Sequence, residues 1–594
     1  MLSHGLSRTT QKVAYLQSVR IPRFYYGTPN EVNAKRLSLT TRFRSILSSA
    51  AFCAVAKSFG RVKNGTFASL VDEAIYSTRK APKETAMELR AAPDLAAADG
   101  SEGSVVIVAD LYRNGSSQKI QSVEIVITKE ESELFNLLRE CLIFSGLKIE
   151  LRVAGGWVRD KLLRVASKDI DIALEHITGV EFCNHLNAFT EKSRGFHKTV
   201  GIVKRRPEQS KHLETATLNI LGLNVDFVNL RSEDYAENSR IPVMKIGTPL
   251  EDAMRRDFTI NSLFYNISTN TIEDHTGKGI EDLNAQIIRT CSPAFSTFMD
   301  DPLRVIRAAR FSARLGYRLD DEIVTASSNP QVLYQLEHKV AKARIAQELD
   351  DMLSRGDTPM AFELMKLFGV LPILVRERPR DTPSDRQIDS GCKTMVLVRE
   401  CLKCLKWNQI DRKLAYIAAF CSPLKGEATI DKCTCIEHVI KSRLRLPNKV
   451  ASGANTIVEG SEEFAAVLSN LPLNIEDLRE ALGAIVRRIG PLWKEALLLS
   501  MASEAFDNST ITPDHLTQKY SDVEIRIHDL NLQDAYSLKA PITGKELMDL
   551  LPGLKPGPQF KEALDFQIKQ LLRSPSLSKQ ELVHSVTNAF KDKV

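Results

Sequence analysis

The stretch GGWVRDKLLRVASKDID at residues 155–171 decides the fold class of this 594-residue chain. The apolar run LRVA (151–154) precedes it, and WVRDKLL within it has the apolar spacing of a helix. This order predicts a strand, a glycine turn, a helix and then a second strand at the two aspartates. A glycine turn that leads from a strand into a helix N-terminus is a common phosphate-binding arrangement, although an ordinary strand-to-helix turn can contain the same glycines.

The two aspartates at the end of this stretch predict a metal site. On a strand, Asp169 and Asp171 point to one face while Ile170 and Ile172 point to the other. Two carboxylates so close repel each other unless a cation lies between them. Mg²⁺ is commonly held by one or two carboxylates together with substrate phosphates, and it can activate a hydroxyl and neutralise a departing pyrophosphate. A solvated strand end with incidental acids is the alternative.

The positive charge of the chain is concentrated at its N-terminus. Residues 1–64 contain eleven Lys and Arg but one acid, Glu31, so their net charge is about +10. The formal net charge of the whole chain is +6, so the remaining residues together carry about −4. An arginine- and serine-rich segment with few acids predicts a mitochondrial or plastid transit peptide. Pools in the cytoplasm and nucleus are a further expectation, and the sequence leaves open whether a second translation start at Met87 yields a cytosolic form. A basic arm that binds RNA is the alternative.

The remaining composition is that of an ordinary globular protein without a membrane span. The apolar fraction is 43%, and no apolar run reaches the roughly 20 residues that a transmembrane helix needs. Ten cysteines spread over so long a chain do not predict a disulfide framework. Cys401 and Cys404, with Cys433, Cys435 and His438 downstream, have the ligand types of a zinc site. However, both cysteines of CLKC fit the apolar face of an amphipathic helix, so we expect no zinc.

Strand-like and helical runs alternate over residues 130–290, which predicts an α/β module. ESELFNLLRECLIFSG (131–146) has helical spacing and ends at Gly146, while IELRVAGG, KDIDIAL and LNVDFVNLR predict three strands. Residues 104–128 predict two further strands joined by a turn. From about residue 295 strand signals nearly vanish, so the second half predicts an all-helical part. A loop rich in Pro, Arg and Asp (376–387) divides it.

Three further stretches narrow the family. EDAMRRDFTINSLFYNI (251–267), DHTGKGIEDLNAQIIRT (274–290) and FMDDPLRVIRAARFSARLG (298–316), together with the stretch at 155–171, resemble the class II tRNA nucleotidyltransferases of eukaryotic type. These are the CCA-adding enzymes of the polymerase-β-type nucleotidyltransferase superfamily. The resemblance is close over 130–355 and looser in the helical remainder.

The resemblance implies an α/β nucleotidyltransferase palm, the head, followed by an elongated all-α neck, body and tail. We expect a transit segment at 1–64, an N-terminal extension at 65–129, the head at 130–290, the neck at 291–355, the body at 356–480 and a tRNA-binding tail at 481–594.

The implied activity is template-independent and metal-dependent. CMP, CMP and AMP are transferred from CTP and ATP to the 3′ end of tRNA, and pyrophosphate is released. The helical body and tail would hold the acceptor stem and TψC region, largely by shape. A poly(A) polymerase of the same fold, or an enzyme that adds only CC or only A, is the nearest alternative. A catalytically inactive RNA-binding homologue is the alternative from another class.

The resemblance also assigns roles to individual residues. Asp169 and Asp171 match the metal-binding catalytic aspartates, and Asp226 in LNVDFVNLR is the best candidate for a third catalytic acid. The positions that match the nucleotide-binding parts are Gly155, Gly156 and Arg159 for the triphosphate, Arg256 and Asp257 for the sugar, with Asn261 nearby, and Asp301, Arg304, Arg307 and Arg310.

Asp301 and Arg304 resemble the amino-acid template that selects CTP and ATP in this family. A spacing of i, i+3 would place both on one helix face, where Asp accepts from an exocyclic amine and Arg donates to ring nitrogens or carbonyls. Asp before Pro302 is also the sequence of a helix N-cap, so capping alone is the alternative. The basic row that Arg307 and Arg310 continue favours the template, because capping alone would not need it.

Two other matches are structural. ARIAQEL (343–349), with Arg344 and Glu348 at i, i+4, resembles the last neck motif. The usual Ser-x-Glu-Arg is altered here to Ala341-Lys-Ala-Arg, which we expect to affect the stability of the neck more than the chemistry. The residues that match a motif linking head and neck are Asp274, Gly277 and Asp282.

Overall fold

The computed structural model describes residues 124–591, apart from 168, 204–214, 235–242, 377–382, 406, 430–431, 473 and 509. The predicted transit segment and the predicted extension up to residue 123 lie outside the described residues. The end of the second strand expected at 104–128 is described, and residues 124–128 form no strand. That part of the prediction is wrong because Thr128 is instead the N-cap of the helix that follows.

The head contains a seven-stranded mixed sheet with the strand order β3-β4-β5-β2-β1-β8-β9. Only β2 and β5 pair in parallel in this sheet. The three strands predicted from IELRVAGG, KDIDIAL and LNVDFVNLR are confirmed as β1, β2 and β5. The strands are β1 (Leu151–Ala154), β2 (Asp169–Leu174), β3 (Gly201–Val203), β4 (Thr215–Ile220), β5 (Leu223–Asn229), β8 (Phe264–Asn266) and β9 (Thr271–Glu273), with a separate ribbon of β6 (Arg231–Asp234) and β7 (Val243–Ile246).

Local sequence sets the ends of the long helices of the head. α6 (Lys129–Ser145) begins at a capping box in which Thr128 accepts from the N–H of Glu131 and the Glu131 carboxylate bonds back. It ends at Gly146, whose φ of 66° is the left-handed conformation that glycine adopts at low cost. The predicted helix is confirmed. α8 (Gly179–Arg194) begins with a box of the same kind.

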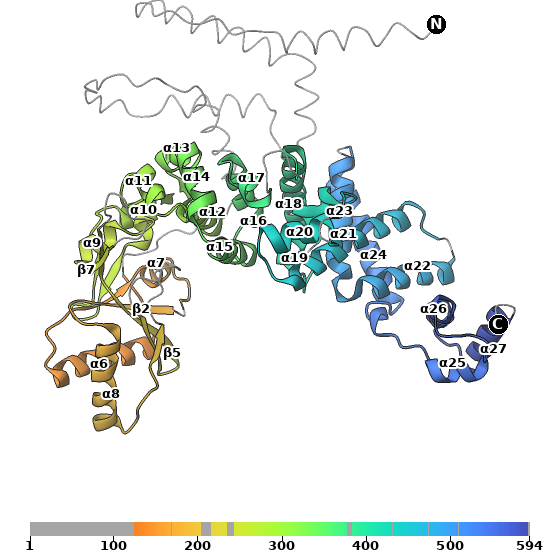
Figure 1. Cartoon of the computed structure of the whole chain (residues 1–594), viewed down its shortest axis with the longest axis horizontal. Coiled ribbons are helices and arrows are strands. Elements are labelled where there is room, and N and C mark those ends of the chain that lie inside the picture. The colour runs from red at the N-terminus through yellow and green to blue at the C-terminus, as the bar shows by residue number, and fades with distance from the viewer. Residues whose placement is uncertain are drawn as a thin grey trace, which may run out of the picture. The chain divides into compact units, whose positions relative to one another are not determined.

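Alternation along β2 and β5 separates a packed face of the sheet from a polar one. Ile170 and Ile172 are buried together with Val225 and Phe227. The ring of Phe182 on α8 lies 5.2 Å from that of Phe227, and α8 covers β4 and β5 while packing against α6 (Figure 1). The aspartates of β2 and β5 therefore project from the opposite face.

A short helix and a parallel two-stranded ribbon connect the sheet to the helices that follow. α10 (Gly279–Ala285) leads into β10 (Ile287–Ile288), which pairs with β11 (Arg318–Leu319). The buried Asp282 accepts from Nε of Arg289 at 3.1 Å. Asp282 thus fixes the chain at the point where the sheet gives way to helices.

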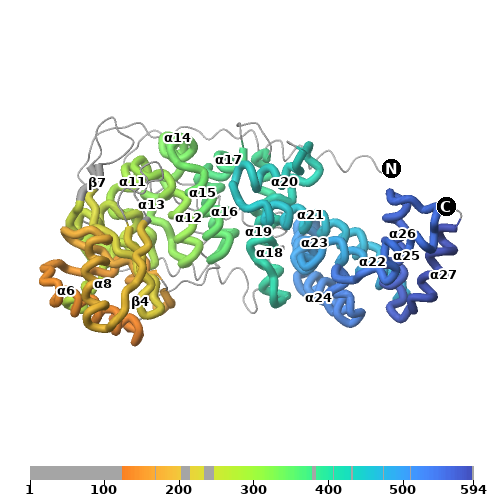
Figure 2. The backbone as a smooth tube through the Cα atoms, turned by 60° about the horizontal axis from the view of Figure 1, so that its bottom comes forward, coloured from red at the N-terminus to blue at the C-terminus, as the bar shows by residue number. Residues whose placement is uncertain are grey.

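From residue 294 onward the described chain is helical apart from β11, which confirms the predicted all-helical half (Figure 2). None of the described helices is both long and apolar enough to cross a membrane. The helices, with α7 and α9 of the head, are α7 (Gly156–Leu162), α9 (Pro249–Met254), α11 (Ala294–Asp300), α12 (Leu303–Leu315), α13 (Asp321–Ser327), α14 (Pro330–Lys339), α15 (Lys342–Ser354), α16 (Thr358–Leu367), α17 (Val370–Val375), α18 (Asp385–Leu405), α19 (Arg412–Cys421), α20 (Cys435–His438), a π-helix at Val439–Arg443, α21 (Asn448–Ser469), α22 (Ile475–Ile489), α23 (Trp493–Asp507), α24 (Pro513–Asp529), α25 (Gly544–Leu550), α26 (Pro558–Arg573) and α27 (Lys579–Phe590).

The loop predicted at 376–387 ends earlier than expected. α18 already begins at Asp385. The reason is local, because the Gln387 side chain accepts from the N–H of Ser384 at 2.8 Å, and the Ser384 hydroxyl accepts in return at 3.4 Å. Residues 377–382 lie outside the described part of the chain.

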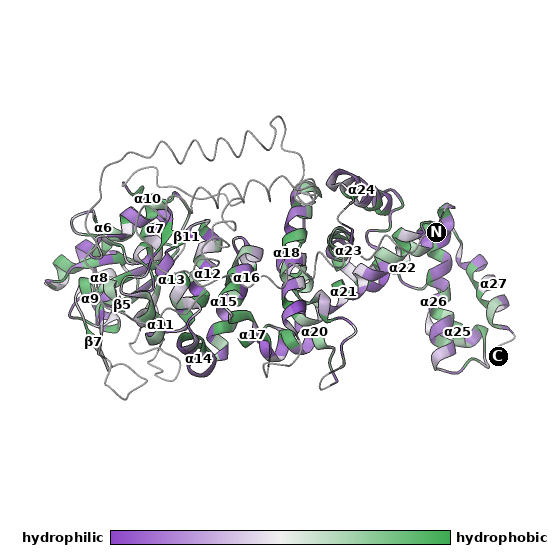
Figure 3. Cartoon of the chain, turned by 90° about the horizontal axis from the view of Figure 1, so that it is seen from above, coloured by the Kyte–Doolittle hydropathy of each residue, from purple (hydrophilic) through white to green (hydrophobic). Residues whose placement is uncertain are grey.

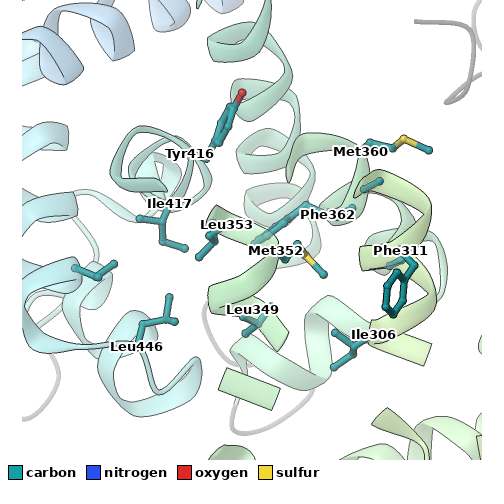
Figure 4. Close-up of a cluster of buried hydrophobic side chains, with 14 of the residues drawn as sticks. Ile306, Phe311, Leu349, Met352, Leu353, Met360, Phe362, Tyr416, Ile417 and Leu446 are labelled. Atoms are coloured by element: carbon teal, nitrogen blue, oxygen red, sulfur yellow. The ribbon is translucent and has the colours of Figure 1, made fainter. Parts of the chain in front are cut away.

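The helices combine apolar and polar faces, as the mixed colouring of α18 shows (Figure 3). Their apolar faces meet in a core that α12, α15, α16 and α19 share (Figure 4). This core packs the helix that carries the predicted template arginine against the next helices of the chain. Its members include Ile306, Phe311, Leu349, Met352, Leu353, Met360, Phe362, Tyr416, Ile417 and Leu446.

The last three helices have a separate apolar core. Leu547 of α25, Ala563 of α26 and Leu582 and Val586 of α27 are almost fully buried in it. α26 also packs on α22, where Gly483 leaves room for Leu572. The proline- and glycine-rich turn at 551–557 separates α25 from α26.

Candidate active site

The three predicted catalytic acids are neighbours on adjacent strands. β2 and β5 run parallel with Asp171 opposite Asp226, and Asp169 lies opposite Asn224. Because residues two apart on a strand share a face, all three carboxylates project from the same side of the sheet. Thr217 on β4 donates its hydroxyl to Oδ1 of Asp226 at 2.6 Å.

The surroundings of Asp171 favour its protonated form. Desolvation raises the pKa of Asp171, and although Arg256 counteracts this, the carboxylates of Asp226 and Asp169 raise the pKa further. The net direction is upward. A divalent cation at this position would stabilise the ionised carboxylate, so the donor set fits a hard cation.

The protein alone does not supply a full coordination sphere here. Among the described residues there is no group of three or more His, Cys, Asp or Glu side chains arranged to hold a metal ion. Asp169 and Asp171 would therefore provide part of the coordination, and water and substrate phosphate the rest, which is the usual situation for Mg²⁺.

Gly155 allows an arginine to approach the turn before α7. Its φ of 70° and ψ of −119° belong to a region that residues with a side chain avoid. A Cβ added to Gly155 would lie 2.6 Å from Nη1 of Arg256, whereas the nearest atom to a Cβ on Gly156 is Nη2 of Arg159, at 3.7 Å. Packing therefore requires a glycine at the first position and tolerates a side chain at the second.

The buried Asp252, which is not among the predicted site residues, holds both arginines of the sequence Arg255-Arg256-Asp257, here called the RRD motif. Asp252 is 1% exposed, and it pairs with Arg255 through Oδ1 and with Nη2 of Arg256 through Oδ2 at 2.8 Å. Its Oδ1 also accepts from the N–H of Arg231 at 3.1 Å. Burial by itself would raise the pKa of Asp252, but the two guanidinium groups hold it below its ordinary value. The sequence pattern that indicates these pairs is the spacing of Asp252, which lies three residues before Arg255 and four before Arg256.

Asp257 and Asn261 connect the RRD motif to the arginines around it. Oδ2 of Asp257 accepts from Nε of Arg307 at 2.8 Å, and Oδ1 accepts from Nδ2 of Asn261 at 3.1 Å. Oδ1 of Asn261 in turn accepts from Arg159, which also pairs with Asp160 at 2.7 Å. Although burial raises the pKa of Asp257, Arg307 and Asn261 hold it below its ordinary value. This carboxylate is therefore ionised at neutral pH.

Asp301 and Arg304 do not lie on one helix face, so that prediction is wrong. α12 begins at Leu303, its N-cap is Pro302, and Asp301 is extended, with φ of −135° and ψ of 93°. A residue before proline is pushed out of the helical region, which explains the early break. Asp301 is thus not the N-cap either, and its carboxylate accepts only a long bond of 3.4 Å from the N–H of Leu303.

The Asp301 carboxylate is instead held by Arg344 of α15. Nη2 of Arg344 donates to Oδ2 at 2.8 Å and Nη1 donates to Oδ1 at 3.2 Å. Arg304 reaches in another direction, and its Nη2 donates to the carbonyl of Arg255 at 2.5 Å. The two predicted template residues therefore face the same space from the α11–α12 junction and the first turn of α12.

Glu348 of α15 pairs with two arginines of the predicted basic row. Oε1 accepts from Nη1 of Arg307 at 2.7 Å, and Oε2 accepts from Nε of Arg310 at 2.6 Å. Although burial lowers the pKa of Arg307, the Asp257 and Glu348 carboxylates raise it above its ordinary value. The row is thus a paired, partly buried network and not a free basic ridge. Arg310 is 9% exposed and lies behind the site.

These side chains surround a single cavity of about 620 Å³, a size typical of small-molecule sites. Four predicted residues do not line it: Gly155, Asp169, Asp226 and Arg310. The predicted residues in its wall are Gly156, Arg159, Asp171, Arg256, Asp257, Asn261, Asp301, Arg304 and Arg307. The wall also contains residues that were not singled out as site residues, namely Arg231, Asp252, Phe311, Gln347 and Glu348.

The cysteines considered for zinc lie away from this cavity. Cys401 is buried in α18, whereas Cys404 is exposed, so only the first of them belongs to the core. Cys435 is buried and Cys433 is partly exposed.

Comparisons with known proteins agree with this geometry. Residues 151–289 match the family described as the poly(A) polymerase head domain. The chain is 30% identical over 478 residues to tRNA nucleotidyltransferase cca2 of Schizosaccharomyces pombe, which spans 77% of this chain and 98% of the relative. It is 31% identical over 536 residues to the mitochondrial CCA tRNA nucleotidyltransferase of Saccharomyces cerevisiae, spanning 80% and 97%.

A solved structure shows the same fold. The CCA-adding enzyme of Bacillus stearothermophilus in complex with CTP superposes with a TM-score of 0.55 at 20% identity, over 79% of this chain and 99% of that one. Fold and site together define a nucleotidyltransferase with a poly(A) polymerase-type head. Within that class, the chain belongs to the tRNA nucleotidyltransferase family, the family of the CCA-adding enzymes.

Proposed function

We propose that this enzyme completes the 3′ end of tRNA by transferring CMP, CMP and AMP from CTP and ATP. The observation that carries the proposal is the meeting in one cavity of the β2 carboxylate Asp171, the Arg256–Asp257 pair and the Asp301–Arg304 pair. The extension of the family relationship over most of the chain supports it. In each round the 3′ hydroxyl of the RNA attacks the α-phosphate, a new P–O bond forms, and the bond to pyrophosphate breaks.

The acids on β2 and β5 would position the reacting groups. Asp169 and Asp171 would hold Mg²⁺, with Asp226 opposite Asp171 as the third acid. When bound, the metal supplies charge neutralisation for the triphosphate and lowers the pKa of the attacking hydroxyl. Gly156 and the buried Arg159 would contact the triphosphate from the α7 side of the cavity. Since no covalent enzyme intermediate is needed, positioning and electrostatics supply the acceleration.

The other side of the cavity would choose the nucleotide. Arg256 and Asp257 are held by Asp252 and Arg307, so they offer a fixed donor and acceptor to the sugar. Asp301 and Arg304 offer an acceptor and donors that suit the pairing edges of cytosine and adenine. Because each is anchored by other protein groups, their spacing is set before a nucleotide arrives.

We also propose the division into head (130–290), neck (291–355), body (356–480) and tail (481–594), with the body and tail holding the acceptor stem and TψC region of tRNA. Because the family that matches the head is described as a poly(A) polymerase head domain, a polymerase that adds only A is the alternative function. An enzyme limited to CC or to A would use the same cavity.

Nucleotide addition by the purified protein separates these functions. A tRNA transcript that ends before CCA is incubated with Mg²⁺ and with CTP, ATP or both, and the products are sequenced. Two C residues with CTP alone and CCA with both support the proposal. Long A tails indicate a poly(A) polymerase, arrest after CC or addition of A only to a CC end indicates a partial enzyme, and no product indicates an inactive homologue.

For localisation we propose a mitochondrial or plastid address in residues 1–64, with further pools in the cytoplasm and nucleus. The charge of about +10 in this segment and the mitochondrial name of a yeast relative support an organelle. Fusion of residues 1–64 to a fluorescent protein tests it, and a diffuse signal would contradict it.

A further inference from the structure

A second cavity of about 590 Å³ lies between the first turns of α15 and the turn that leads into α21. Lys342, Ala343 and Ala346 form one wall, and Leu446 and Pro447 form the other. It is a neighbour of the catalytic cavity, because Gln347 lines both. None of its other lining residues belongs to the site described above.

The free charge of this cavity is positive. Its one acid, Asp350, is paired with Lys413. Its two cations, Lys342 and Arg445, are both exposed, and neither has an ion-pair partner in the part of the chain that the structure describes. Two unpaired cations and a neutralised acid select an anionic ligand.

The backbone that carries Arg445 is itself unusual. It follows a π-helix at Val439–Arg443, and Arg445 has a φ of 56°, a left-handed value that is uncommon for a residue with a side chain. The next residue, Leu446, is buried in the shared apolar core (Figure 4). Leu446 thus anchors the turn, while the exposed Arg445 lines the cavity. Irregular backbone of this kind is often retained at binding sites.

Apart from the exposed Gln347, the remaining lining is small and apolar. Ala343, Ala346 and Pro447 offer apolar surface without hydrogen-bonding side chains, next to the buried Leu446. A ligand that fits has a negatively charged group for the two cations and a flat, weakly polar group for this surface. A nucleotide has both.

We propose that this cavity binds a nucleotide in the unpaired 3′ segment of the RNA substrate, upstream of the reacting end, with its phosphate between Lys342 and Arg445. The inference rests on the proposed function, because it takes the neighbouring cavity as the place where the 3′ hydroxyl reacts. The wall that Gln347 shares sets the order, with the reacting end in the first cavity and the preceding nucleotide in the second. Contacts to a phosphate and to the face of a base do not depend on which base is bound. The cavity could therefore hold the preceding nucleotide in each successive round of addition.

The test compares the variants Lys342→Ala, Arg445→Ala and the double variant with Lys148→Ala, which removes one charge from an exposed lysine of the head that lines neither cavity. Affinity for a tRNA transcript without CCA is measured by filter binding at several salt concentrations. Each single variant should weaken binding by about fivefold, the upper end for an exposed ion pair. Each should also reduce the steepness of log affinity against log salt by about 0.7, the value for one phosphate of a single strand. Lys148→Ala should change neither quantity.

Kinetics distinguish this site from a site for free nucleotide. In the same variants KM for tRNA should rise while KM for CTP and ATP and kcat stay near wild type. A rise in KM for CTP or ATP without a change for tRNA would overturn the proposal in favour of a free triphosphate site. Unchanged binding and an unchanged salt slope in the double variant would also overturn it.

A substitution that reverses one charge gives an independent check. Lys342→Glu places a carboxylate in the lining of the cavity, at the first residue of α15, where an acid stabilises a helix. Thermal stability should be kept or raised while affinity for tRNA falls, so a loss of binding cannot be ascribed to unfolding. Wild-type protein that binds tRNA without adding nucleotides would contradict the proposed function alone, since the salt slope is measured without catalysis.

Discussion

The guanidinium of Arg344 donates two parallel hydrogen bonds, of 2.8 and 3.2 Å, to the two carboxylate oxygens of Asp301. The acid comes from the junction of α11 and α12 and the base from the first turn of α15. A planar carboxylate held at both oxygens cannot rotate, so Arg344 decides which direction the remaining lone pairs of Asp301 present to the cavity. With Asp301 as the proposed template acid, Arg344 would take part in nucleotide choice although it lies outside the predicted template.

The first prediction concerns that pair. Arg344→Ala should lower the rate of CTP and ATP incorporation by about tenfold and raise the share of UTP and GTP incorporated, because charged hydrogen bonds contribute about 1.5–3 kcal/mol and fix orientation. Single-nucleotide incorporation assays measure both effects. Arg344→Lys keeps the charge without the fork and should restore rate more than selectivity. Unchanged selectivity in Arg344→Ala would show that Arg344 acts on stability alone.

The second prediction concerns the metal-binding face. Asp171→Ala should abolish nucleotide addition, by at least about 10³-fold, since metal-assisted charge stabilisation contributes several kcal/mol. Binding of tRNA should stay near wild type. The free energy of unfolding should not fall, because the change removes repulsion with Asp226. Single-turnover kinetics and filter binding check this, and the isosteric Asp171→Asn should behave alike. Activity close to wild type in Asp171→Asn would remove Asp171 from the metal site.

The third prediction follows from the raised pKa of Asp171. The ionised carboxylate is the form that binds metal, so activity is full above that pKa and is lost as pH falls through it. The acid limb of kcat should therefore have its midpoint above the ordinary aspartate value of about 3.9. Because protons and metal compete for the same oxygens, more Mg²⁺ should move this midpoint to lower pH. If the midpoint of the acid limb does not change with Mg²⁺ concentration, the limb reports the titration of a group other than Asp171.

The fourth prediction compares the two glycines of the first turn. Gly155→Ala should lower the free energy of unfolding by about 1–3 kcal/mol, because of its strained backbone and the approach of Arg256 to 2.6 Å. Gly156→Ala, helical and without a close neighbour, should leave it unchanged or raise it by up to about 1 kcal/mol. Thermal or denaturant unfolding compares the two. Equal changes in the two variants would show that neither the backbone conformation nor the approach of Arg256 requires a glycine at 155.

Sequence patterns captured the parts of this molecule that are local. The alternation in KDIDIAL and LNVDFVNLR was enough to place Asp169, Asp171 and Asp226 on one face, because a strand has a fixed period. Helix ends at Gly146 and the all-helical second half followed from capping residues and apolar spacing.

Partners that depend on packing between distant segments were not predictable in this way. The Glu348 contact with Arg310 joins α15 to α12, and nothing in the spacing of either helix indicates which acid meets which arginine. The i, i+3 spacing alone predicts Asp301 on the helix of Arg304, but Pro302 keeps the residue before it out of the helical conformation. The role of Asp252 is not evident from the sequence, because an acid in a charged stretch is usually on the surface. Only the fold shows that Asp252 is buried and paired with two arginines.

The fifth prediction concerns the altered neck motif. The N-cap of α15 is Ala341, which has extended geometry but makes no side-chain hydrogen bond. Ala341→Ser should supply that bond and raise the free energy of unfolding by about 1 kcal/mol, with activity unchanged. Ala343→Ser, inside the same turn, cannot cap and serves as the control. Equal stabilisation by both serines would exclude capping as the cause.

The separate core of α25, α26 and α27 has a consequence for tolerance to change. Damage to Leu547 or Val586 would be confined to that small core, because the residues around Asp171 pack in another. The residues that face only this small core can therefore change without altering the cavity around Asp171, whereas Ile568 and Leu572 of α26 belong to the larger core. Substitutions in the large core would therefore disturb the catalytic cavity more than substitutions in the small core of α25, α26 and α27.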